Sequence, residues 1–149
     1  MIDDLAESAL IKYTNDLMKR SFVSDLPKIQ ADIEKFISEY SETYPNYIVY
    51  ARRRGNDIKR IFYLEKMSET EAYELYLDYM NLGFDDLGYE IGVVWWFYRA
   101  TNDAIKKQEY ENHILRVISS NFDSKEIREE VQLMPDLVEK AKVLKNRST

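Results

Sequence analysis

The sequence predicts a mainly helical α+β fold: a helical bundle around a central buried helix, with one β-hairpin. The chain has 149 residues, the size of one ordinary domain, and 45% of them are hydrophobic, as in other globular proteins. Apolar residues recur at helical spacing over most of its length. Four glycines and three prolines are too few to connect many short strands. We therefore expect residues 1–149 to form a single globular domain.

The first elements are predicted to be a helical hairpin over residues 2–40. Apolar residues spaced three and four apart begin at Ile2 and predict a helix over residues 2–19. A second apolar stripe follows Ser24, the predicted N-cap, and ends before Pro45. The connection between the two helices is short, which favours an antiparallel pair.

Residues 46–65 are predicted to form the β-hairpin. Residues 47–50 and 58–64 are rich in β-branched and aromatic side chains, which favour strands. Between them, residues 54–57 read Arg-Gly-Asn-Asp, a sequence typical of a tight turn. An isolated hairpin is marginally stable in water, so this one must either pack against the helices or pair with a further strand, which the sequence does not identify.

Helices are predicted over most of residues 68–147. Ser68 and Glu71 form a capping-box pattern that begins the first of them. A further helix is predicted around Tyr110 and Ile114 from the spacing of its apolar residues. The remaining boundaries are predicted at Gly83, Ser124 and Pro135.

Residues 85–107 are predicted to form the central buried helix, because apolar side chains occupy almost every side of it. Gly88 and Gly92 are four residues apart and would let a neighbouring backbone approach closely. The alternative is a buried strand through Ile91–Tyr98, since periodicity separates helix from strand poorly over eight apolar residues. We favour the helix.

Several kinds of catalytic and metal site are excluded by composition. The chain has no cysteine, so it has no disulfide and no thiolate ligand or nucleophile. Its one histidine, His113, is predicted to lie partly exposed on a helix, and no nucleotide-binding glycine pattern or serine-nucleophile motif is present. Carboxylate oxygens suited to Mg²⁺ are present at Asp85, Asp86 and Glu90. Acidic residues in the first turn of a helix also complement the helix dipole, and we favour this second interpretation. We expect a non-enzymatic protein with no catalytic residue, metal or cofactor.

Charge is distributed unevenly along the chain. Residues 46–66 contain six Lys or Arg and two Asp or Glu, a net charge of +4, within a protein whose net charge is −6. Arginine and tyrosine dominate the binding energy of many protein interfaces. An alternative is that the arginines pair with acidic residues on adjacent helices or are merely solvated. The residues predicted to bind a partner are Tyr47, Tyr50, Arg52, Arg53, Arg54, Lys59, Arg60 and Tyr63.

The predicted function is to bind and modulate another macromolecule; we favour a protein as the partner and inhibition as the effect. Bacterial immunity proteins, antitoxins and phage-encoded antagonists of host machinery are of this general kind. The first alternative is a nucleic-acid-binding regulator that uses the basic hairpin 46–65, in which arginines contact phosphates and aromatic rings stack on bases. The second alternative is an enzyme that uses carboxylates and tyrosines. The acidic N-terminus is unlike a secretory signal, and the longest apolar run is too short to span a membrane, so a cytoplasmic location is expected. The oligomeric state is not predicted.

Overall fold

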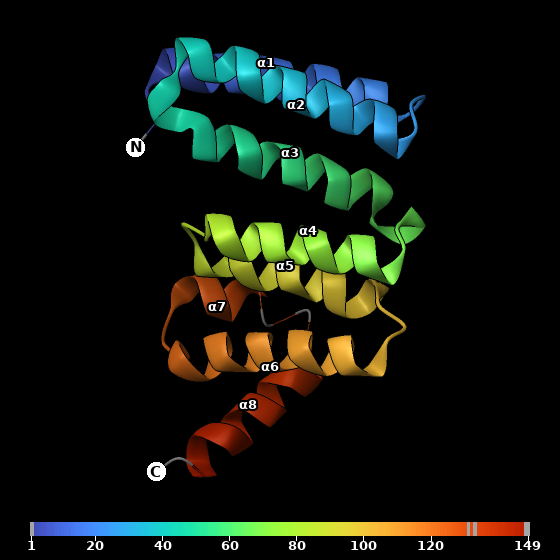
Figure 1. The fold of residues 1–149 in the computed structure, drawn as a ribbon. Coiled ribbons are helices and arrows are strands. Elements are labelled where there is room, and N and C mark those ends of the chain that lie inside the picture. Colours follow the sequence, from blue (N-terminus) through green and yellow to red (C-terminus); the bar gives the residue numbers. More distant parts are fainter. Residues whose placement is uncertain (1, 131, 133, 148–149) are drawn as a thin grey trace. The chain divides into compact units, whose positions relative to one another are not determined.

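The computed structural model describes residues 2–130, 132 and 134–147 (Figure 1). Within these ranges the regular structure is helical and contains no strand. The predicted α+β class is therefore wrong, because residues 46–65 do not form a β-hairpin; the helical part of that prediction fits the structure. The contacts divide the chain into two compact units, Met1–Met67 and Ser68–Thr149, which are described in turn. The single domain over residues 1–149 stays a prediction.

The first unit consists of three α-helices, α1 (Asp4–Ser21), α2 (Leu26–Thr43) and α3 (Ile48–Tyr63), and two short 3-10 helices, η1 (Pro45–Tyr47) and η2 (Leu64–Lys66). Both of its first two helices begin with an aspartate cap. The Asp3 carboxylate accepts a hydrogen bond from the Ala6 amide at 2.9 Å, and the Asp25 carboxylate accepts one from the Lys28 amide at 3.0 Å. The cap of α2 is thus Asp25, one residue after the predicted Ser24.

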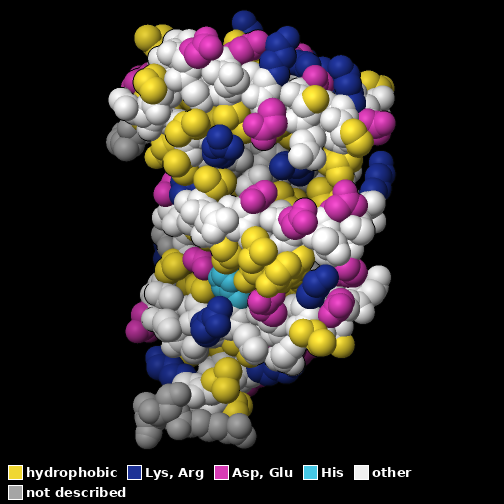
Figure 2. Space-filling model, in the orientation of Figure 1, with side chains coloured by type: hydrophobic (Ala, Val, Ile, Leu, Met, Phe, Trp, Pro, Cys, Tyr) yellow, Lys and Arg dark blue, Asp and Glu magenta, His cyan; other side chains and the backbone are white. Residues whose placement is uncertain are grey.

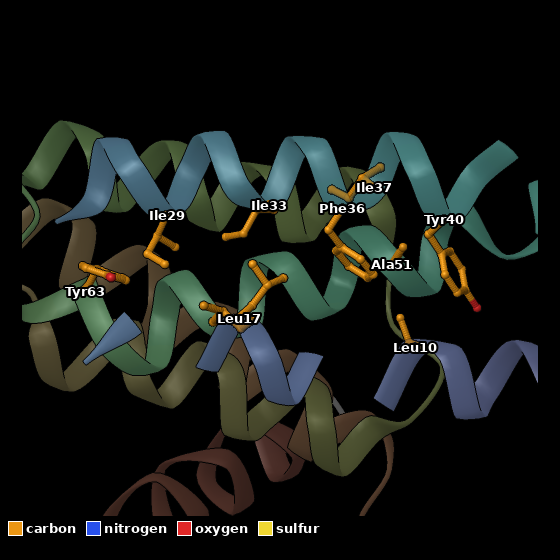
Figure 3. Packing of buried hydrophobic residues seen from close by; sticks show 10 residues of the cluster. Leu10, Leu17, Ile29, Ile33, Phe36, Ile37, Tyr40, Ala51 and Tyr63 are labelled. Atoms are coloured by element: carbon orange, nitrogen blue, oxygen red, sulfur yellow. The ribbon is translucent and has the colours of Figure 1, made fainter. Parts of the chain in front are cut away.

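The core of the first unit lies among its three helices, as Figure 3 shows for Leu10, Leu17, Ile29 and their neighbours. Two buried tyrosines tie the helices together through their hydroxyl groups. Tyr40 donates a hydrogen bond to the Ala6 carbonyl at 2.8 Å, and Tyr63 donates one to the Ser24 carbonyl at 2.8 Å. Each buried hydroxyl therefore has the partner that burial requires.

Residues 48–63 form a helix because their apolar residues repeat at helical spacing. The residues that pack inward follow one another at intervals of three and four: Ile48, Ala51, Gly55, Ile58 and Phe62. An added Cβ at Gly55 would lie 2.7 Å from Cγ2 of Ile33 on α2. Gly55 also has no positive φ angle. The glycine that suggested a turn therefore permits close contact between two helices.

The second unit contains α4 (Glu69–Leu82), α5 (Leu87–Ala100), α6 (Ala104–Ser120), α7 (Lys125–Glu130) and α8 (Pro135–Arg147). The predicted capping box is confirmed, since the Ser68 side chain accepts from the Glu71 amide and the Glu71 side chain accepts from the Ser68 amide, both at 3.1 Å. Gly83 follows α4 with a φ of 74°, a conformation that favours glycine.

Helix α5 confirms the helical interpretation of Ile91–Tyr98, but it ends at Ala100 rather than at residue 107. The chain turns after it because Asp103 caps α6, accepting from the amides of Ile105 and Lys106. Its core-facing side chains are almost fully buried: Ile91, Val93, Val94 and Phe97. Trp95 and Trp96 are only partly buried, so α5 is apolar but not enclosed on every side.

Candidate binding surface on the third helix

The helical structure of α3 distributes its cations around the helix. Successive residues of an α-helix are rotated by about 100°, so Arg52 and Arg54 lie about 160° apart. Arg52 and Lys59 are seven residues apart and fall within about 20° of each other. The basic residues that are consecutive in the sequence therefore do not form one patch on α3.

A different set of residues shares one side of α3. Tyr50, Arg54 and Ile61 fall within about 40° of arc around the helix axis, and Tyr47 lies three residues before Tyr50. Arg54 is exposed and the Ile61 side chain is 46% exposed, while the two tyrosines are partly buried against the core. Their rings lie edge to face, with centroids 6.1 Å apart. We call Tyr47, Tyr50, Arg54 and Ile61 the α3 stripe.

Two of the predicted partner-binding residues lie in the interior. Tyr63 is 2% exposed and Arg60 is 8% exposed. Burial raises the pKa of the Tyr63 hydroxyl. The Arg60 guanidinium lies 3.4 Å from the carboxylate of Asp57, one helical turn before it. In the structure these two side chains are held within the protein, and they do not contribute to an open surface.

The remaining predicted residues differ in their contacts. The Arg53 guanidinium lies 5.9 Å from the centre of the Tyr50 ring, a cation–π geometry. Among the described residues, no carboxylate oxygen lies within 4.0 Å of a side-chain nitrogen of Arg52, Arg54 or Lys59. The alternative in which these arginines pair with acidic residues of adjacent helices therefore does not hold for Arg52 and Arg54.

Ile61 was not predicted to be a surface residue. Its strand-like neighbours placed it in the predicted hairpin, where it would have been one of several alternating apolar positions. On α3, Ile61 lies seven residues after Arg54 and therefore on the same side of the helix. Its large apolar side chain is exposed there. Helical spacing from Tyr50 through Arg54 to Ile61 is the signal that would have identified it.

The second unit contains a buried polar network around His113. This residue is 6% exposed, so the prediction of a partly exposed histidine is wrong. Its Nδ1 lies 2.8 Å from the Tyr76 hydroxyl and its Nε2 lies 2.6 Å from a carboxylate oxygen of Glu90. A carboxylate only accepts hydrogen bonds, so Nε2 bears the proton on that side. In Figure 2 the cyan of histidine is a small area bordered by hydrophobic side chains in yellow and acidic ones in magenta.

The Tyr76–His113–Glu90 network has the groups of a proton relay but the surroundings of a core. The Tyr76 ring is 5% exposed and packs against Phe97 and Tyr110, with ring centroids 5.7 and 4.8 Å away. Burial raises the pKa of Tyr76 to about 12, which keeps its hydroxyl protonated at neutral pH. This hydroxyl is directed to histidine inside an aromatic cluster, and the geometry supports a structural role.

The carboxylates considered as a magnesium site have other partners. Asp86 caps α5 by accepting from the Tyr89 amide at 2.8 Å, and Glu90 bonds to His113. Within the residues that the structure describes, no three His, Asp or Glu side chains are grouped to hold a metal ion. The acidic side chains at this helix start thus act as a cap and as a partner for a buried histidine.

A scan of protein-family models, a search of curated proteins and a search of solved structures give no match to this chain. None of the described helices combines the length and apolar character needed to cross a membrane.

Proposed function

We propose that this protein binds another protein through the α3 stripe and modulates its activity, inhibiting it without chemistry of its own. One observation carries the proposal: an exposed arginine without an ion-pair partner among the described residues lies in line with tyrosine rings and a large exposed isoleucine. Arginine and tyrosine contribute disproportionately to protein interfaces, and a flanking apolar side chain helps to exclude water from such contacts.

The charge of the stripe indicates the chemistry of the partner. Arg54 is the only charged member, and α3 as a whole carries five basic residues and one acidic residue. We expect the partner to present a carboxylate to Arg54 and an apolar depression to Ile61. A bidentate arginine–carboxylate contact beside buried apolar area is the arrangement that gives both affinity and orientation.

A nucleic-acid partner is less well supported by the same geometry. Phosphate binding gains from several cations that follow one backbone, because each neutralised phosphate adds to the affinity. On α3, Arg52 and Lys59 lie on a different side from Arg54, while Arg60 is buried beside Asp57. The proposal therefore names a protein, and nucleic acid becomes an outcome of the test.

The test compares two arginines that differ in little except position. Wild-type protein, Arg54→Ala and the matched control Arg52→Ala are immobilised, and proteins retained from the source-cell extract are quantified by mass spectrometry, with and without nuclease. Both arginines are exposed, and a surface charge contributes little to stability, so both variants should fold. A third variant, Ile61→Asp, places a charge on the apolar part of the stripe.

We expect a protein that wild type and Arg52→Ala retain equally, and that Arg54→Ala and Ile61→Asp lose by tenfold or more, about 1.4 kcal/mol. Its retention should not depend on nuclease. The retained protein is then purified, and its activity is measured with and without this protein to test inhibition. Equal retention by all variants would contradict the stripe, and retention that nuclease abolishes would contradict the protein partner.

A further inference from the structure

We infer that a second site, in the unit formed by residues 68–149, binds a small organic cation such as an alkyl- or arylammonium ion. A pocket of about 550 Å³ lies between α5 and the start of α8. This volume is within the range of small-molecule sites. The pocket is lined by Trp95, Tyr98, Met134, Pro135, Asp136, Leu137, Glu139 and Lys140.

The aromatic walls of the pocket already attract cations from the protein itself. The Arg99 guanidinium lies 4.0 Å from the centre of the Trp95 ring, and the Lys107 ammonium lies 4.8 Å from the centre of the Tyr98 ring. An aromatic ring attracts cations through the negative potential of its two faces. Trp95 and Tyr98 line the pocket, so a cation bound there lies beside two rings that have this potential.

The charges of the lining favour a positive ligand as well. Asp136 and Glu139 bring two carboxylates, whereas Lys140 is the one lining cation and lies 2.5 Å from the Glu111 carboxylate. Glu139 forms a surface pair with Lys142 at 3.2 Å. No ion pair within 4.0 Å joins Asp136 to a described residue, although the pKa of the Lys140 ammonium is raised by its hydrogen bond to Glu111 and also by the charge of Asp136. A ligand ammonium group in the pocket would therefore share the Asp136 carboxylate with Lys140.

The apolar part of the pocket indicates what kind of body the ligand has beside its ammonium group. Met134 and Leu137 are 4% exposed, so an apolar body that enters beside them loses contact with water, and Trp95 and Tyr98 supply flat surfaces for stacking. A compact amine with an aromatic or branched alkyl body combines the ammonium group and the apolar surface. The guanidinium side chain of a peptide offers related chemistry, and the experiment distinguishes the two sources.

The experiment uses the fluorescence of Trp95 in the full chain carrying Trp96→Phe, so that one tryptophan reports. Phenylethylammonium is titrated at neutral pH beside 2-phenylethanol, its neutral counterpart. The binding variant is Asp136→Asn, and the matched control is Asp78→Asn, which removes a carboxylate from an exposed position on α4. A blocked arginine tripeptide is titrated as the third ligand, and circular dichroism verifies that each variant is folded.

We expect saturable quenching by phenylethylammonium and at least about fivefold weaker binding of the neutral alcohol, as a cation–π and carboxylate site requires. Asp136→Asn should weaken ammonium binding by about three- to tenfold, while Asp78→Asn leaves it unchanged. The inference is overturned if the alcohol binds equally, if Asp136→Asn has no effect, or if quenching does not saturate. Tighter binding of the tripeptide would overturn the small-molecule assignment.

Discussion

The substitution Gly55→Ala tests the packing of α3 against α2 directly. The new Cβ would lie 2.7 Å from Ile33 Cγ2, closer than carbon atoms approach without displacement. This methyl group is attached to the branched Cβ of a residue that is 1% exposed, and in a helix that side chain has essentially one rotamer. The contact therefore cannot be relieved by moving a flexible chain end.

Two effects of opposite sign determine the stability of this variant. Alanine improves helix propensity over glycine by about 1 kcal/mol. Overpacking a close-packed interior costs about 1–3 kcal/mol. We expect Gly55→Ala to lower the free energy of unfolding by about 1 kcal/mol, because the stiffness of Ile33 places the packing cost above the gain in propensity.

A double-mutant cycle with Ile33→Ala separates these effects, with urea unfolding followed by circular dichroism. Ile33→Ala alone should cost about 2–5 kcal/mol. In that background the contact is absent, so Gly55→Ala should become stabilising by about 1 kcal/mol. The control is Gly83→Ala, whose φ of 74° is unfavourable for alanine although no atom lies within 4 Å of the new Cβ. Its cost should not depend on residue 33.

The close contact between α2 and α3 is refuted if Gly55→Ala stabilises the wild-type chain. It is also refuted if the substitution costs the same in both backgrounds. A background-independent cost is what a turn conformation at residue 55 would produce, and it would restore the hairpin interpretation of this segment.

The remaining predictions concern the second unit. Tyr76→Phe should cost about 1–3 kcal/mol in urea unfolding, because it removes the partner of His113 Nδ1 in the interior. The pKa of Tyr76 is raised from 10.0 to about 12, so the protonated hydroxyl contributes fully to stability below pH 10. This contribution, about 3 kcal/mol in total, is lost as the pH rises through 12. The Tyr76→Phe variant should lack this part of the alkaline loss of stability. Phe97→Ala should cost about 3–5 kcal/mol, and Trp95→Ala clearly less, since Phe97 is 1% exposed and Trp95 is partly exposed; thermal unfolding compares the two. Ser68→Ala should cost about 1 kcal/mol by loss of the capping box, measured by urea unfolding.

The elements that sequence reasoning identified are those whose cause is local. The capping box at Ser68 and Glu71 requires only residues three apart, and both hydrogen bonds are formed. The end of α4 at Gly83 requires one residue with a positive φ, and it has one. For such features the chain near the residue contains all the necessary information.

Residues 46–65 were misassigned because local preference and packing disagree there. β-Branched residues and the Arg-Gly-Asn-Asp sequence favour a hairpin locally, but the apolar spacing from Ile48 to Phe62 buries a helical face. Gly55 is decisive, and its role depends on Ile33, which is 22 positions earlier and on another helix. That relationship cannot be recognised in the segment itself.

The polar network around His113 was missed for a related reason. Its two hydrogen bonds connect residues that are 37 and 23 positions apart in the sequence. No short sequence motif predicts hydrogen bonds over such separations. Helical spacing could have predicted that His113 is buried. It follows Tyr110 by three residues and lies on the same face of α6 as Ile114, and all three residues are buried. A polar residue on an apolar helical face requires a buried partner, which Tyr76 and Glu90 supply.

The change from hairpin to helix alters what the three consecutive arginines mean for binding. In a strand, successive side chains point to opposite faces, so Arg52 and Arg54 would share one face. An interface on that face would contact both residues, and substituting either one would weaken binding. On α3 they lie about 160° apart, and only Arg54 is aligned with Tyr50 and Ile61. An interface on one side of this helix can contact one of the two, so the unequal response to Arg54→Ala and Arg52→Ala follows from the backbone conformation.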